Sequence, residues 1–111
     1  MFRISLNRVH DTITVREGNE RLTLKVDKDP IAIAVELKGA QKALEGVKDD
    51  SSTVEKIKAA KNLSEAIFGE KQTEKLFEFY GGDPGCVVTI CGMYFEKRLS
   101  KKIIKAQKKL K

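Results

Sequence analysis

Apolar and polar residues alternate along the first 26 positions of the chain. The alternating apolar residues are Phe2, Ile4 and Leu6, then Ile13 and Val15, and then Leu22, Leu24 and Val26. A period of two indicates strands with one buried face and one solvated face. We therefore expect three strands within residues 1–26, forming an antiparallel meander. A first turn is expected near residues 8–11, and a second at 17–20, where Gly18 and Asn19 tolerate positive φ.

After residue 27 the apolar spacing becomes helical. Start signals occur at Asp29-Pro30, at Ser52 with its capping-box partner Glu55, and at Asp83-Pro84. These signals and the apolar stripes predict four helices, at residues 29–46, 52–68, 71–80 and 84–109. Strands followed by helices indicate an α+β fold, and the length suits a single domain over residues 1–111, with the helices packed on one face of the sheet.

The positive charge of the chain is concentrated at its C-terminal end. Of 22 Lys and Arg residues, eight lie in residues 96–111 beside a single acidic residue, which leaves 14 basic and 15 acidic residues in 1–95. Three interpretations of this basic segment stay open: a solvated helix end, a contact with an acidic protein, or a contact with nucleic acid. Lysines without interleaved aromatic rings are a weak basis for base recognition.

No residue pattern predicts a catalytic, cofactor-binding or metal site. His10 is the only histidine, and the spacing of Cys86 and Cys91 matches no common zinc motif, so we expect both cysteines to be reduced and packed. No apolar run approaches the roughly 20 residues that span a bilayer, and the N-terminus has no signal-peptide pattern. The sequence therefore predicts a cytoplasmic protein that is not an enzyme and has no membrane partner.

Six of the seven Phe and Tyr residues lie between positions 68 and 95. They could form a core or an adhesive surface. Because the apolar helical faces exceed what a small sheet can cover, we expect self-association or a partner groove. The residues that we expect to contact a partner are Phe77, Phe79, Tyr80, Tyr94, Lys101 and Lys105.

Residues 62–77, Asn-Leu-Ser-Glu-Ala-Ile-Phe-Gly-Glu-Lys-Gln-Thr-Glu-Lys-Leu-Phe, resemble the tail assembly chaperones of siphophages and related prophages. In that family a helix ends at a Phe-Gly-Glu turn and a short polar helix follows. Phe68 is expected to pin this turn in the core, Gly69 to end the helix with a positive φ, and Glu70 to begin the next helix.

The resemblance implies a non-catalytic function. Such chaperones coat the tape measure protein during tail construction, help to recruit tail tube subunits, act in the bacterial cytoplasm and are absent from the mature virion. The expected partners are therefore the tape measure protein, the tail tube protein and further copies of the chain, rather than nucleic acid. The alternative is a small nucleic-acid-associated regulatory protein that uses its basic C-terminal helix.

Overall fold

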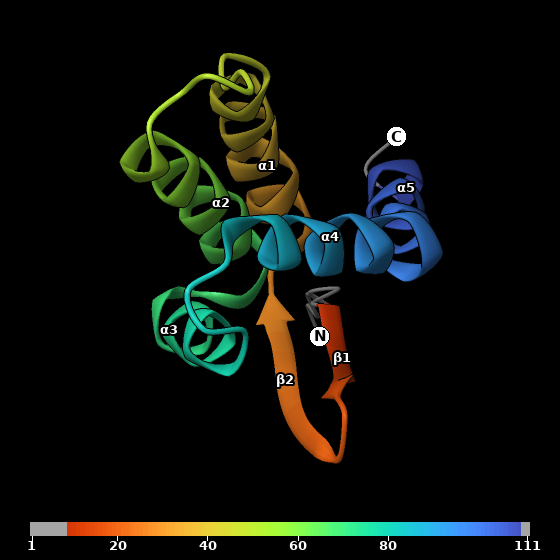
Figure 1. Ribbon diagram of the computed structural model, residues 1–111. Coiled ribbons are helices and arrows are strands. Elements are labelled where there is room, and N and C mark those ends of the chain that lie inside the picture. Colours follow the sequence, from red (N-terminus) through yellow and green to blue (C-terminus); the bar gives the residue numbers. More distant parts are fainter. Residues whose placement is uncertain (1–8, 110–111) are drawn as a thin grey trace, which may run out of the picture.

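The computed structural model describes residues 9–109, in which a β-hairpin is followed by helices (Figure 1). Strands β1 (Val9–Glu17) and β2 (Glu20–Lys28) pair antiparallel. Gly18 at the turn has φ of 61° and Asn19 does not have a positive φ, which is the pattern of a type II′ turn and suits the twist of a two-residue hairpin. The α+β class and this turn are confirmed.

The sheet differs from the predicted three-stranded meander. The described residues form two strands, and the segment with Phe2, Ile4 and Leu6 lies outside them. The prediction of a first turn near residues 8–11 is wrong for residues 9–11, because Val9 and Asp11 belong to β1. Asp11 is a strand residue on the inner face of β1, where a tyrosine and an arginine from the last helix satisfy its carboxylate.

Helices α1 (Pro30–Glu45) and α2 (Thr53–Phe68) begin where the sequence predicts. The Asp29 carboxylate accepts the Ile31 amide at 3.0 Å, and the Ser52 hydroxyl accepts the Glu55 amide at 3.2 Å. Each cap satisfies an amide that has no partner within its own helix.

Helix α3 (Glu70–Phe79) follows α2 after one residue, Gly69. Gly69 has φ of 83° and ψ of 170°, so its predicted positive φ is confirmed. Its amide still donates to the Glu65 carbonyl at 3.0 Å, and its own carbonyl accepts the Thr73 amide at 3.1 Å. One glycine thereby ends one helix and begins the next.

The last helical segment contains a local irregularity. It consists of α4 (Pro84–Tyr94), a π-helical stretch η1 (Phe95–Leu99) and α5 (Ser100–Lys109), so the helix predicted at 84–109 is present with one wide turn inside it. Buried positions before the stretch include Cys91 and Tyr94, and those after it include Leu99 and Ile103. The wide turn keeps one face of the helix against the core on both sides of the stretch.

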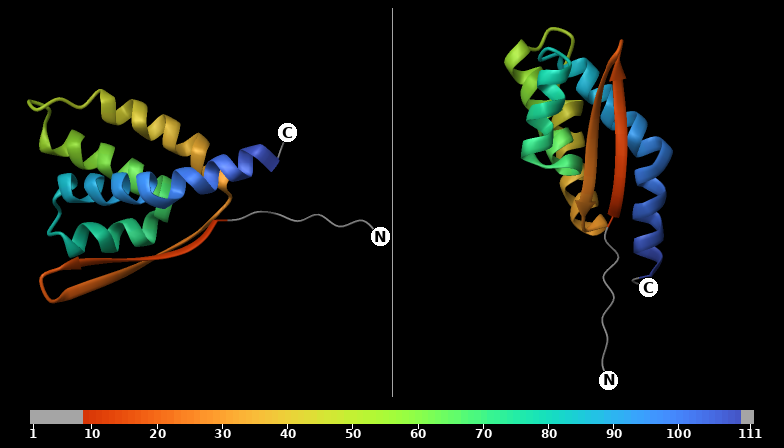
Figure 2. Two further views of the ribbon diagram at one scale, coloured as in Figure 1. Left: turned by 90° about the vertical axis from the view of Figure 1, so that its right-hand side faces the viewer. Right: turned by 90° about the horizontal axis from the view of Figure 1, so that it is seen from below.

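The helices lie on one face of the hairpin (Figure 2). In the view from below, β1 lies between β2 and the helix that runs from α4 to α5. A single core fills the space between the hairpin and the helices, and its largest fully buried side chains include Leu24, Ile33, Ile67, Leu76 and Leu99. No helix among residues 9–109 is both long and apolar enough to cross a membrane.

Candidate partner-binding groove

A groove of about 370 Å³ runs between β1 and the α4–η1 helix. Its strand side is the stretch from Ile13 to Arg16, and its helix side comes from α4 and η1. The walls are mainly apolar, whereas three cations stand at the rim. The apolar lining residues are Ile13, Val15, Tyr80, Ile90, Met93 and Tyr94, and the cations are Arg16, Lys97 and Arg98.

Asp11 connects the strand side of the groove to the helix side. Its carboxylate accepts the Tyr94 hydroxyl at 3.1 Å and the Arg98 guanidinium at 3.0 Å. The Asp11 side chain is 13% exposed, so the carboxylate of this ion pair is largely shielded from solvent. Hydrogen bonds to an ionised carboxylate are stronger than those between neutral groups. These two bonds hold β1 against the α4–η1 helix.

Tyr94 forms the base of the groove. It is 5% exposed, and its ring lies 5.9 Å from that of Phe68 between centroids. Burial, with the nearby Asp11 carboxylate adding to it, raises the pKa of the Tyr94 phenol well above its usual value. The phenol therefore stays protonated near neutral pH and keeps donating its hydrogen bond.

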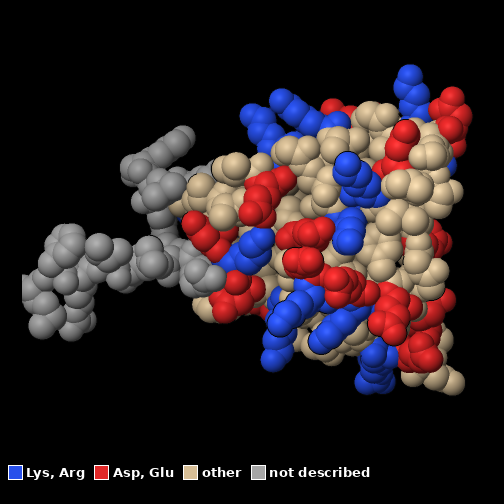
Figure 3. Space-filling model, turned by 90° about the vertical axis from the view of Figure 1, so that its left-hand side faces the viewer, with Lys and Arg blue, Asp and Glu red and all other residues tan. Residues whose placement is uncertain are grey.

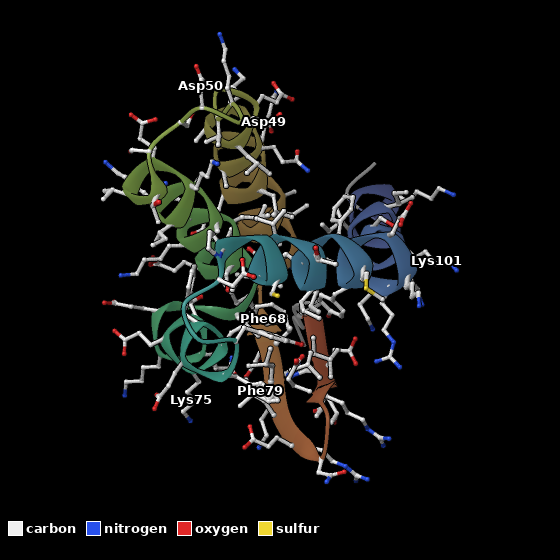
Figure 4. All side chains as sticks on the ribbon, in the orientation of Figure 1. Asp49, Asp50, Phe68, Lys75, Phe79 and Lys101 are labelled. Carbon is white, nitrogen blue, oxygen red and sulfur yellow. The ribbon has the colours of Figure 1, made fainter. Side chains whose placement is uncertain are left out.

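The turn between α2 and α3 packs against the helix side of the groove, where Phe68 contacts Tyr94. Ser64 and Thr73 are fully buried, and their hydroxyls are 2.7 Å apart in a hydrogen bond that joins the two helices. Cys91 of α4 is also buried here, and burial raises its pKa to about 12, so it stays a neutral thiol. Phe68 is 5% exposed, as predicted, and lies near the centre of the molecule (Figure 4).

The structure brings only two of the six predicted partner-contacting residues into the groove. Tyr80 and Tyr94 line it, although Tyr94 is largely buried. Phe77 and Phe79 are half-buried and pack against the core, with Phe79 in an edge contact to Tyr80 at 5.1 Å between ring centroids.

The other two predicted partner-contacting residues, Lys101 and Lys105, lie away from the groove. Both are exposed on α5, and Lys101 points outward from the helix (Figure 4). The opposite side of α5 is not free, because Ile103 and Ala106 are buried there. The exposed lysines of α5, which are Lys101, Lys105 and Lys108, thus lie on the solvated face of a packed helix. The face over α2 and α3 carries interspersed acidic and basic side chains (Figure 3), as is usual for solvated surface.

Sequence reasoning missed most of the groove lining. Ile13 was expected only on the buried face of a strand, and Arg16, Met93 and Lys97 were not among the expected partner-contacting residues. Met93 is 46% exposed although it is a large apolar residue beside the buried Tyr94. A large apolar residue just outside the buried stripe of a helix can indicate a binding surface. Met93 is such a residue, and it is the signal in the sequence that could have indicated the groove.

The described residues contain no group of three or more His, Cys, Asp or Glu side chains placed to hold a metal ion. Cys86 and Cys91 are both free thiols. Comparison with protein-family models, with curated proteins and with solved structures gives no significant match to this chain. The functional argument therefore depends on the residues and on the groove.

Proposed function

We propose that this protein is a non-catalytic tail assembly chaperone that binds the tape measure protein through the groove between β1 and the α4–η1 helix. The observation that carries the proposal is the groove itself: an apolar hollow of about 370 Å³ with the cations Arg16, Lys97 and Arg98 at its rim. Apolar surface that a small protein leaves open is a common mark of a protein-binding site.

The segment that resembles the chaperone family supports the proposal indirectly. Residues 62–77 form the end of α2, the Gly69 turn and most of α3. Within this segment Ser64 and Thr73 bond to each other, and Gln72 bonds to the backbone of β2. These residues build the fold, so the resemblance concerns the scaffold, and the partner surface lies elsewhere on it.

The charges around the groove suit a complex that forms and dissociates readily. A protein that coats a long partner and is later displaced by tail tube subunits needs many modest contacts rather than a few tight ones. An apolar hollow beside the exposed cations Arg16, Lys97 and Arg98 provides such contacts, because salt screens exposed charges. We propose that this happens in the bacterial cytoplasm, with several copies on one partner, and that the protein is absent from the finished virion.

The proposal is tested by two titrations, one with a fragment of the tape measure protein and one with DNA or RNA, each at about 50 and about 200 mM salt. Truncating α5 is unsuitable, because Ile103 and Ala106 are part of the packed interior. The comparison protein is instead a triple variant in which the exposed Lys101, Lys105 and Lys108 are changed to Gln.

We expect fragment binding that changes only a few-fold with salt and that survives in the triple variant. Nucleic acid binding through several phosphates would instead fall by about 10³-fold or more over the same salt range. Strong nucleic acid binding that is lost in the triple variant, together with no binding of the fragment, contradicts the proposal and favours the regulatory alternative.

A further inference from the structure

We propose that the open edge of β1 takes up an extended, acidic segment of the partner protein as an additional strand of the sheet. This inference adds a binding mode to the proposed function, and it rests on that function only in assuming that the partner protein binds in the groove. Groove binding without strand pairing remains a separate outcome of the experiment described below.

The pairing register shows which backbone groups face outward. In a two-residue hairpin, Glu17 and Glu20 exchange hydrogen bonds, and every second pair after them does the same. The pairs between are not bonded to each other, so their N–H and C=O groups point away from the partner strand. Lys25 belongs to such a pair. Its N–H and C=O groups both bond to the Gln72 side chain of α3, as expected for backbone groups that point away from β1.

The two edges of the hairpin are therefore different. The edge of β2 is closed at Lys25 by Gln72. On β1 the outward amide of Thr12 is taken by the Asp11 carboxylate at 2.9 Å. The outward backbone groups of Thr14 and Arg16 bond to no described residue. This open stretch coincides with the strand side of the groove, which runs from Ile13 to Arg16.

An added strand would gain contacts from its side chains as well as from its backbone. Unpaired groups on a strand edge are a template for another strand, and in strand addition the backbone provides affinity while pockets for alternate side chains provide specificity. Ile13 and Val15 point to the inner face, opposite Leu24 and Leu22. Every second side chain of an added strand would continue that inner face, into the groove beside Met93 and Ile90. The α4–α5 helix lies on the side of β1 away from β2 (Figure 2), and the groove is lined by residues of β1 and of this helix.

The charges at the rim select an acidic segment. Among residues 9–109, Arg16 and Lys97 make no ion pair, and Arg98 pairs with Asp11 alone. An incoming segment with carboxylates beside its apolar residues would pair with Arg16 and Lys97, since Arg98 already has Asp11. Residues 1–8 of the chain contain two arginines and no acidic residue, so their charge does not suit this rim.

The first experiment uses a labelled peptide of about eight residues in which Val or Ile alternates with Glu. It is titrated against the full chain, beside the same peptide with alternate backbone amides N-methylated and beside a peptide with Lys in place of Glu. We expect the N-methylated and the Lys peptides each to bind at least about tenfold more weakly, because one loses its backbone donors and the other repels the rim. Equal affinity of the methylated peptide would overturn strand pairing, and equal affinity of the Lys peptide would overturn the acidic preference.

The second experiment changes the strand edge itself. Thr14→Pro removes one outward amide from β1 without removing a bond of the hairpin, because Thr14 and Thr23 form a pair that is not hydrogen-bonded. The matched control is Thr23→Pro, the same change on the opposite edge. We expect Thr14→Pro to weaken acidic peptide binding at least about tenfold and Thr23→Pro to change it less than about twofold, at similar melting temperatures.

Three further outcomes contradict the inference. Equal effects of the two proline variants would show that the β1 edge is not used. Retained binding of the tape measure fragment by Thr14→Pro would overturn strand addition and leave the proposed function standing. Nuclear Overhauser contacts between residues 2–6 and Thr14 in the free protein would show that the chain itself occupies this edge.

Discussion

Gly69 illustrates at the scale of single residues how one backbone conformation supports the fold. Its φ of 83° with ψ of 170° lies in a region that is almost restricted to glycine. We expect Gly69→Ala to lower the free energy of unfolding by about 1–3 kcal/mol. Gly39→Ala, within α1 and with open space around the added methyl group, is expected to raise it by about 0.5–1 kcal/mol. Denaturant titrations of both variants measure the difference, and shifts of the same sign would refute this account of the turn.

Individual residues were predictable where local chemistry decides their role. Phe68 and Gly69 have the predicted burial and backbone conformation, since glycine readily takes a positive φ at a helix end and the adjacent apolar Phe68 packs into the core. Val54 is an apolar residue of the helix predicted at 52–68, yet it is 75% exposed, because the first turn of the helix extends beyond the core. Asp11 was misassigned because its two partners, Tyr94 and Arg98, are more than 80 positions away in the chain.

At the scale of elements, the π-helical stretch η1 follows from the spacing of buried residues. Val87, Cys91 and Tyr94 precede it at steps of four and three, and Leu99 and Ile103 continue at a step of four. The step of five from Tyr94 to Leu99 does not fit a regular α-helix, and a π turn accommodates it. The buried set is known only from the structure, because in the sequence the apolar Phe95 lies four positions before Leu99 and continues a regular helical pattern.

The interaction between α3 and the edge of β2 is a second feature at this scale, and it can be tested directly. We expect Gln72→Ala to expose the Lys25 backbone, to raise the hydrogen-exchange rate of the Lys25 amide about tenfold and to cost about 1 kcal/mol of stability. The control is Gln41→Ala on the exposed side of α1, with the same change of helix propensity. If the Lys25 amide exchanges at the same rate in both variants, Gln72 does not protect this edge.

The whole molecule depends on contacts that no local pattern reveals. The helices and the hairpin turn were predictable because capping, glycine placement and apolar periodicity act over a few residues. The groove was not, because Ile13 and Ile90 come together only when α4 crosses beside the hairpin. The same holds for the charges: the sequence placed the basic residues at the C-terminal end, and folding separates Lys97 and Arg98 at the groove from the lysines of α5.

The central claim is that a partner protein binds in the groove between β1 and the α4–η1 helix. Met93 and Val54 are both exposed apolar residues, but only Met93 lines the groove. The most direct measurement is the dissociation constant of the tape measure fragment for Met93→Glu and for Val54→Glu. The account predicts a loss of at least about tenfold for Met93→Glu, since a carboxylate there disfavours both apolar contact and an acidic partner, and a change below about twofold for Val54→Glu. Equal affinities of the two variants would contradict it.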